Sequence, residues 1–377
     1  MIYLDFNRTT PLAPSVLEAM QPYWSTHFML PDQGHAQSQA VSEALESARE
    51  EVASMVGCEP FEIVFTGGGT EANNLAIQGL LRRQDPGVVL VSQLEHDSVL
   101  AAARSLVDQR SDSPWEVKLV PCESDGRIDP DRLREQLCSR TRLVCVQLAN
   151  PVLGTIQPIR EMADACHNLG VPLHCDATQA FGKIPVDVAL LRADTLSVSG
   201  HKFYGPKGSG AIYVRRGLQL SPIAFGEPRE MGLRPGAENV PALIGLGTAA
   251  ALAGKCATDA SKSLSVLRER FVKGVFSSFA EEPIVLCEGC HSLPNTVAVE
   301  LPGVARQVQR AARQLVVAAP LSESPPDEMT RVLRAIGRTD AQIGRTLRIS
   351  LGWTTSHQQV DRAVELLADA CETLAAS

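Results

Sequence analysis

The stretch from Ser197 to Gly208 reads Ser-Val-Ser-Gly-His-Lys-Phe-Tyr-Gly-Pro-Lys-Gly and continues an apolar, strand-like run that starts at Thr195. It places one lysine, Lys202, among glycine, hydroxyl and imidazole groups at the predicted end of a strand. A lysine amine becomes a nucleophile toward aldehydes when burial or nearby charge lowers its pKa. Neighbouring hydroxyl and N–H donors suit the phosphate of an aldehyde cofactor. The stretch therefore suggests pyridoxal phosphate bound by Lys202, with an ordinary basic loop as the alternative.

A second signal lies one strand-and-helix unit upstream. The segment His174-Cys175-Asp176-Ala177-Thr178-Gln179 ends a short apolar run, so Asp176 is predicted at the carboxyl end of a strand. Such ends carry functional side chains in parallel sheets. An aspartate at this place is suited to pair with the protonated pyridine nitrogen of the cofactor, although aspartate also caps turns.

Alternating strand and helix patterns extend outward from these two segments. They predict an α/β fold with a mostly parallel sheet covered on both faces and functional loops at the strand ends. After about Pro241, long helical patterns surround short strands, which predicts a smaller α+β domain. The predicted strands are 62–66, 88–92, 143–148, 172–175, 195–199 and 211–214 in the larger part, and 284–286, 296–300 and 347–351 in the smaller one.

These residues, with several other segments in a fixed order, resemble the cysteine desulfurase family of class-V aminotransferase-like, fold type I pyridoxal phosphate enzymes. The resemblance extends from Tyr3-Leu4-Asp5 to the last predicted helix. It implies a large cofactor-binding domain at 15–240 with a sheet of the seven-stranded type, a small C-terminal domain at 241–377, an N-terminal segment at 1–14 packed on the small domain, and a homodimer. The matching segments are Phe65–Asn74, Glu95–Val99, Asp176–Gln179, Ser199–Lys202 and Leu347–Gly352.

The resemblance implies a catalytic set of three residues. Lys202 would bind the cofactor and move the Cα proton of the substrate, His96 would stack on the cofactor ring, and Asp176 would hold the ring nitrogen. Arg348 would bind the substrate carboxylate with its planar guanidinium, and Asn150 would assist near the same carboxylate and the ring. The alternative for Arg348 is an interior ion pair.

The remaining cofactor contacts follow from the same resemblance. Gly69 and Thr70 would present backbone N–H groups and a hydroxyl to the phosphate at the N-terminus of a helix. Ser199 and His201 would complete the phosphate site, and Gln179 would donate to the phenolic oxygen of the cofactor.

The loop that presents the catalytic cysteine of the family departs from the pattern. Counting back from Val332 without gaps places Ser322 at the cysteine position, and none of the ten cysteines lies in the Pro320–Pro326 loop, which is predicted to form a lid. Serine cannot carry a persulfide sulfur, whereas β-elimination of a sulfur group from Cβ needs no protein thiol. The substrate-side wall, which reads Asn150-Pro151-Val152, has also lost polar groups relative to the family.

The sequence therefore predicts a carbon–sulfur lyase that acts on cysteine or a related sulfur amino acid. Three alternatives stay open: a cysteine desulfurase that uses another thiol as acceptor, a class-V aminotransferase, and a catalytically degenerate scaffold protein. A sulfur-acceptor protein is not evident in the sequence. The products of the reaction distinguish the three enzymes.

Composition favours a small-molecule enzyme of the cytoplasm. A net charge of −8 without a dense Lys/Arg stripe argues against nucleic acid or anionic membrane as the main partner. No apolar run reaches the length of a transmembrane helix, and the first residues lack the pattern of a signal peptide. The ten cysteines are scattered, and Cys287 and Cys290 lack further ligands at zinc spacing, so no metal site is predicted.

Overall fold

The computed structural model describes residues 1–31, 33–108, 115–279, 281–321 and 325–376. Its larger part is built on a seven-stranded sheet in the order β2-β8-β7-β6-β5-β3-β4. Only β8 runs antiparallel to its neighbours, so the predicted α/β fold with a mostly parallel sheet is confirmed. The strands are β2 Ile63–Thr66, β3 Val88–Ser92, β4 Glu116–Val120, β5 Thr141–Gln147, β6 Leu173–Asp176, β7 Thr195–Ser199 and β8 Gly210–Val214.

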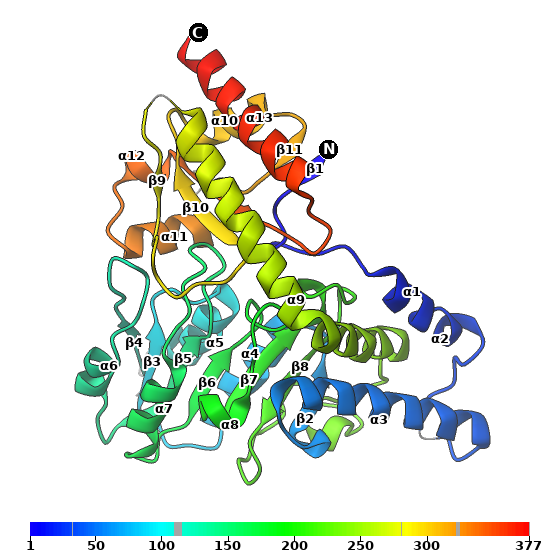
Figure 1. The fold of residues 1–377 in the computed structure, drawn as a ribbon. Coiled ribbons are helices and arrows are strands. Elements are labelled where there is room, and N and C mark those ends of the chain that lie inside the picture. Colours follow the sequence, from blue (N-terminus) through cyan, green and yellow to red (C-terminus); the bar gives the residue numbers. More distant parts are fainter. Residues whose placement is uncertain (32, 109–114, 280, 322–324, 377) are drawn as a thin grey trace.

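Helices cover both faces of this sheet, as Figure 1 shows. On one face α4 (Gly69–Leu81) and α5 (Asp97–Asp108) bury their apolar side chains against alternate strand residues such as Val89 and Val91. The other face packs against α1 (Pro14–Met20), α3 (Ala36–Val56), α6 (Pro130–Gln136), α7 (Ile159–His167) and the first part of α9 (Val240–Ser278). Burial on both faces explains why the central strands are continuously apolar. The short helices α2 (Pro22–Ser25) and α8 (Val188–Leu191) and the 3-10 turns Pro60–Glu62, Gly200–Lys202 and Glu230–Gly232 complete this part.

The C-terminal part forms a second, smaller core. Its three-stranded antiparallel sheet has the order β12-β10-β9, and a two-stranded parallel sheet pairs β1 with β11. The strands are β1 Ile2–Tyr3, β9 Ile284–Val285, β10 Thr296–Glu300, β11 Leu315–Val316 and β12 Thr346–Ser350. The helices are α10 Ala305–Ala311, α11 Glu328–Ala335, α12 Asp340–Ile343 and α13 His357–Ala375.

Helix α9 belongs to both cores. Leu246 and Ala250 lie in the larger core, whereas Leu267 and Phe271 lie in the smaller one. The two parts of α9, Val240–Cys256 and Thr258–Ser278, meet at an angle of 71°, and Figure 1 shows the second part rising beside α13. The division at residues 240 and 241 stays a prediction, because the helix that follows it packs first against the large sheet. No single helix among the described residues is long and apolar enough to span a membrane.

The N-terminal segment connects the two cores across the site. Ile2 and Tyr3 pair with β11, and Leu4 is buried in the smaller core. Phe6 is buried in the larger core, and the backbone N–H of Thr10 donates to the carbonyl of His201 at 2.9 Å. The N-terminal segment therefore contacts both the smaller core and the lysine-bearing turn of the larger part.

Candidate active site

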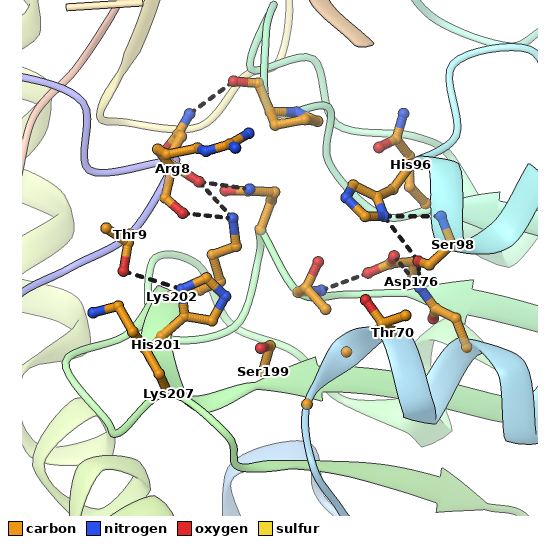
Figure 2. A pocket seen from close by; sticks show the side chains of 18 of the residues that line it. Arg8, Thr9, Thr70, His96, Ser98, Asp176, Ser199, His201, Lys202 and Lys207 are labelled. Carbon is orange, nitrogen blue, oxygen red and sulfur yellow. Dashed lines mark hydrogen bonds between the residues drawn. The ribbon is translucent and has the colours of Figure 1, made fainter. Parts of the chain in front are cut away.

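A cavity of about 560 Å³ lies where the carboxyl ends of the parallel strands meet the N-terminal segment and the smaller core. Strand ends supply Gln147, Asp176 and Ser199, in accordance with the placement of ligand sites in open parallel sheets. Figure 2 shows Lys202 and His201 on one side of this cavity and His96 and Asp176 on the other. Of the predicted site residues, nine line the cavity: Gly69, Thr70, His96, Asp176, Gln179, Ser199, His201, Lys202 and Arg348.

Lys202 ends the short 3-10 turn Gly200–Lys202 that follows β7. Its Nζ donates to the carbonyl oxygens of Asn7 at 2.7 Å and Arg8 at 3.1 Å. Burial, together with the charges of Arg348 and Arg8 and against the opposing effect of Glu328, lowers the pKa of Lys202 to about 8. The uncharged amine, which is the form that attacks an aldehyde, is therefore more populated near neutral pH than it is in an exposed lysine.

Asp176 ends β6 and is almost fully buried. One carboxylate oxygen accepts from Nδ2 of Asn73 at 2.8 Å and the other from the backbone N–H of Thr178 at 2.9 Å. Both donors fix the orientation of the carboxyl group and leave acceptor capacity on each oxygen. The side chain is thus oriented by two hydrogen bonds at the end of β6, where a protonated ring nitrogen would pair with it.

Asn73 is itself oriented by a buried histidine. Nε2 of His174 lies 3.0 Å from Oδ1 of Asn73, and Nδ1 lies 2.9 Å from Oγ1 of Thr195. Burial lowers the pKa of His174 to about 4, so the ring is neutral at physiological pH. Because Asn73 donates to Asp176, its oxygen must accept, and His174 therefore carries its proton on Nε2.

The first turn of α4 forms a cradle of the kind that binds phosphate. Gly68 caps the helix with φ +141° and provides no side-chain acceptor for the free N–H groups. A Cβ on Gly69 would lie 2.8 Å from Cγ2 of Thr178 and 3.4 Å from Cβ of Ser199, so only glycine fits there. Free N–H groups at the N-terminus of a helix attract anions.

Side chains around this cradle complete the donor set. Thr70, Ser199, His201 and Lys207 all line the cavity, and Figure 2 shows them along its lower edge, from Thr70 on the right to Lys207 on the left. Burial, together with the charges of Lys202 and Lys207, lowers the pKa of His201 to about 4, so His201 is neutral and keeps an N–H to donate. The cradle, Asp176 and the amine of Lys202 together match the phosphate, ring nitrogen and aldehyde of pyridoxal phosphate, so the residues present fit this cofactor.

His96 and Gln179 also contact the cavity, each with a polar group already engaged. Nδ1 of His96 lies 2.8 Å from Oγ of Ser98, which fixes the orientation of the ring. Nε2 of Gln179 donates to the carbonyl of Asn7 at 3.0 Å, and its Oε1 accepts from Lys183 at 2.8 Å. The contact of Gln179 with a phenolic oxygen therefore stays a prediction.

Arg348 lies on β12 and is 7% exposed. One of its terminal nitrogens pairs with Asp5, which fits the interior ion pair that the sequence left open. Its Nε is buried and has no hydrogen-bond partner among the described residues. The guanidinium thus keeps an unused donor beside the cavity, as binding of a carboxylate requires.

Asn150 is the exception among the predicted residues. It is fully buried and is absent from the described cavity wall, where Pro151 and Gln147 appear instead. Its Oδ1 accepts from the backbone N–H groups of Val152 and Leu153 at 2.8 and 2.9 Å. The amide therefore stabilises the turn behind the wall, and the structure does not support the predicted contact of Asn150 with cofactor or substrate.

Sequence reasoning missed several residues that line the cavity. Asn73 lies one helical turn after Thr70, and the spacing of three residues was a usable signal. Arg8 and Glu328 lie more than 300 residues apart in the sequence. No local pattern identifies either one as a residue of the site. The other residues that were missed are Asn7, Thr9, Gly67, Gly68, Glu71, Ser98, Gln147, Pro151, Thr178, Lys207 and Gly208.

The predicted lid at Pro320–Pro326 includes Ser322, which lies outside the described residues. Helix α11 begins just after this loop, and its first residue, Glu328, reaches the cavity wall. Oε1 of Glu328 is buried and without a hydrogen-bond partner among the described residues.

Comparisons with known proteins identify the family of the chain. The family model for aminotransferase class-V matches residues 2–363. Cysteine desulfurase IscS of Anaeromyxobacter sp. (strain K) is 37% identical over 98% of this chain and 92% of its own length. Cysteine desulfurase IscS 1 of Archaeoglobus fulgidus is 36% identical over 99% of this chain and 98% of its own.

Solved structures give the same result. A structure described as a NifS-like protein superposes with a TM-score of 0.90 at 29% identity and covers all of both chains. A structure described as SspA in complex with cysteine has a TM-score of 0.82 at 32% identity over 93% of this chain and 99% of its own. From these matches of sequence and fold, the chain belongs to the cysteine desulfurase family of class-V aminotransferase proteins, which depend on pyridoxal phosphate.

Proposed function

We propose that this protein is a carbon–sulfur lyase that acts on cysteine or an S-substituted cysteine. The observation that carries the proposal is a cavity with a complete cofactor set, Lys202, Asp176 and the cradle of α4, in a chain without a cysteine in the catalytic loop. Bound pyridoxal phosphate supplies an electron sink that makes the Cα–H of an amino acid acidic and lets a group leave from Cβ.

The residues of the chain account for the remaining steps. Arg348 binds the α-carboxylate with its free Nε, and its ion pair with Asp5 fixes the guanidinium. Lys202 accepts the proton from Cα, as its lowered pKa permits. The Cβ–S bond then breaks, and the sulfur leaves with the bonding electron pair and a proton.

The overall reaction balances without an oxidant or a protein thiol. The S-substituted cysteine and one water give pyruvate, ammonium and the free thiol of the substituent. For cysteine itself the sulfur product is hydrogen sulfide. This chemistry would allow a cavity of this family to act without a cysteine in the Pro320–Pro326 loop.

Product analysis tests the proposal. Holoprotein with L-cysteine should form pyruvate, ammonium and sulfide in equal amounts, and Lys202→Ala should form none. Full activity of Lys202→Ala would refute the mechanism. Amino-group transfer to an added keto acid would identify an aminotransferase, and a protein that does not bind pyridoxal phosphate would be a scaffold.

A second candidate is a cysteine desulfurase that uses a free thiol or another protein as sulfur acceptor. The relatives named cysteine desulfurase favour it. Its products are alanine and a persulfide on the acceptor, so the same assay separates it from the lyase.

We further propose that the enzyme is a homodimer of the cytoplasm. Trp24, Phe28 and Phe225 are large apolar side chains that are 64%, 66% and 83% exposed, as expected of residues that a second subunit covers. The ten cysteines are all free thiols, which suits a reducing compartment. Light scattering of the holoprotein should give twice the mass of the chain, and the mass of a single chain would exclude the dimer.

A further inference from the structure

Arg8 is a charged residue of the cavity to which the mechanism above assigns no role. It lies on the N-terminal segment, and Figure 2 shows its side chain extending into the space between Lys202 and His96. Its guanidinium makes no hydrogen bond or ion pair with any residue that the structure describes. Arginine side chains that line ligand sites bind carboxylates and related anions through their planar pair of donors.

The backbone of Arg8 is held against the reacting centre. Its carbonyl accepts from Nζ of Lys202 at 3.1 Å, and its N–H donates to the carbonyl of Asp5 at 2.9 Å. The preceding Asn7 donates from Nδ2 to the carbonyl of Pro151 at 3.0 Å and to Oγ1 of Thr296 at 2.8 Å. The backbone of Arg8 is therefore held in place beside Lys202, so its side chain reaches the cavity from a defined position. A defined position suits a residue that selects among substrates.

The acidic residues of the described cavity wall have other neighbours. Asp176 accepts from Asn73, and Glu71 accepts from the N–H of Gly67 at 2.6 Å and from Arg234 at 3.3 Å. The charge of Glu328 raises the pKa of Lys202 against the effect of burial. None of the three neutralises Arg8 at ion-pair distance within the described residues.

The two arginines that line the cavity, Arg348 and Arg8, differ in whether an acidic residue pairs with them. Arg348 already pairs with Asp5, and its buried Nε is an unused donor, which suits a single carboxylate. Arg8 keeps its whole guanidinium for another group. A substrate whose α-carboxylate binds Arg348 would therefore meet a second, uncompensated positive charge in the same cavity.

We propose that Arg8 selects substrates with a second anionic group, so that the preferred class is cysteine substituted at sulfur with a group that ends in an anion such as a carboxylate. This proposal rests on the proposed lyase function. The reaction itself is unchanged: the Cβ–S bond breaks, and the anionic substituent leaves as its thiol.

Two ligands of nearly equal shape test the inference. S-carboxymethyl-L-cysteine carries the second charge, and S-carbamoylmethyl-L-cysteine replaces that carboxylate with a neutral amide. Titration of the holoprotein with each, followed by the change in the visible absorbance of the bound cofactor, gives two dissociation constants whichever reaction follows. We expect the charged ligand to bind at least about 10-fold more tightly than the amide, because its second carboxylate would form a charge-assisted hydrogen bond with Arg8.

Variants at position 8 identify the source of this preference. Arg8→Gln should remove it by weakening only the charged ligand, and Arg8→Lys should keep part of it. Arg216→Gln is the control, because Arg216 is exposed at the edge of the sheet beside Phe61, away from the cavity wall. Turnover should change in the same way: in Arg8→Gln the KM should rise for the charged substrate and stay unchanged for the amide.

The outcomes separate this inference from the proposed function. Equal binding of the two ligands by the unaltered protein, or equal weakening of both in Arg8→Gln, would overturn the role of Arg8. Loss of bound cofactor in Arg8→Gln would also overturn it and would assign Arg8 to the cofactor. A tenfold preference without pyruvate from either ligand would keep the anion site and refute the lyase.

Discussion

The amine of Lys202 determines when the cofactor is able to bind. Burial lowers the pKa of Lys202 to about 8, and only the uncharged amine attacks the aldehyde of pyridoxal phosphate. The rate at which cofactor-free protein takes up pyridoxal phosphate should therefore rise with pH and level off above about 8. Stopped-flow absorbance from pH 6 to pH 10 measures this, since the amine at the usual pKa of about 10.4 would give no plateau in that range. An uptake rate that still rises steeply near pH 10 would contradict the lowered pKa of Lys202.

The hydrogen bond from Asn73 to Asp176 should contribute to turnover. Asn73→Ala removes a bond to a charged group that is worth about 1.5–3 kcal/mol and leaves Asp176 without its side-chain donor. We expect kcat to fall by about 10-fold or more while the fold is kept. Asn74→Ala is the matched control, because the Asn74 amide bonds only to the carbonyl of Thr70 in its own helix among the described residues. If kcat fell equally in both variants, the loss would come from a general destabilisation of α4 and not from the bond to Asp176.

Residues next to strong local signals could be predicted from the sequence, and residues brought in by distant chain segments could not. Lys202, Asp176 and Gly69 follow strands within a few residues, so their place at the sheet edge follows from the alternating pattern. Arg8 depends on a segment that reaches the site only because β1 pairs with β11. The direction of the Asn150 amide could not be predicted, because it depends on a turn between the site and the core.

At the scale of elements, the first turn of α4 is the most constrained part of the site. A methyl group on Gly69 would collide with Thr178 and occupy the phosphate cradle. Gly69→Ala should therefore weaken cofactor binding by about 10-fold or more, since a small displacement of these N–H groups loses charge-assisted bonds. Gly344→Ala is the control, because its Cβ would meet backbone oxygens only at 3.4 and 3.5 Å. Equilibrium dialysis with pyridoxal phosphate gives both affinities, and unchanged affinity in Gly69→Ala would place the phosphate elsewhere.

The strand that leads into this turn is anchored by a buried ion pair. Glu230 accepts from Arg49 at 2.7 and 2.8 Å and from the backbone N–H of Phe65 on β2 at 2.7 Å. Glu230→Ala leaves Arg49 buried and unpaired on that side, which should cost about 3–5 kcal/mol. Glu46→Ala removes the exposed partner of the same arginine and should cost less than about 1 kcal/mol. Urea unfolding compares the two, and equal midpoints would show that the buried pair contributes little.

The strand pattern predicted most of the elements because burial on both faces makes central strands apolar. β3, β7 and β10 have the predicted bounds, and the other predicted strands differ by one or two residues at their ends. β4 was missed, because it is an edge strand with exposed charged residues such as Glu116 and Lys118. β1 and β11 are two residues long and exist only through their mutual pairing, which no local pattern indicates.

At the scale of the whole molecule, the site depends on two cores that are fixed relative to one another. The N-terminal segment holds Lys202 through Asn7 and Arg8, and the smaller core supplies Arg348 and Glu328 to the same cavity. The shared helix α9 and the crossing N-terminal segment keep these contributions together (Figure 1). The residues proposed to bind the cofactor therefore come mainly from the larger part. Those proposed to bind the substrate, Arg8 and Arg348, come from the N-terminal segment and from β12 of the smaller part.

The central claim is that this cavity eliminates sulfur from its substrate and does not pass it to a thiol. The ratio of pyruvate to alanine formed from L-cysteine, measured with and without an added small thiol, tests this most directly. We expect pyruvate to dominate in both reactions, and Ser322→Ala to leave the ratio and the rate unchanged. If alanine dominates instead and increases with the added thiol, the protein is a cysteine desulfurase with an external acceptor and not a lyase.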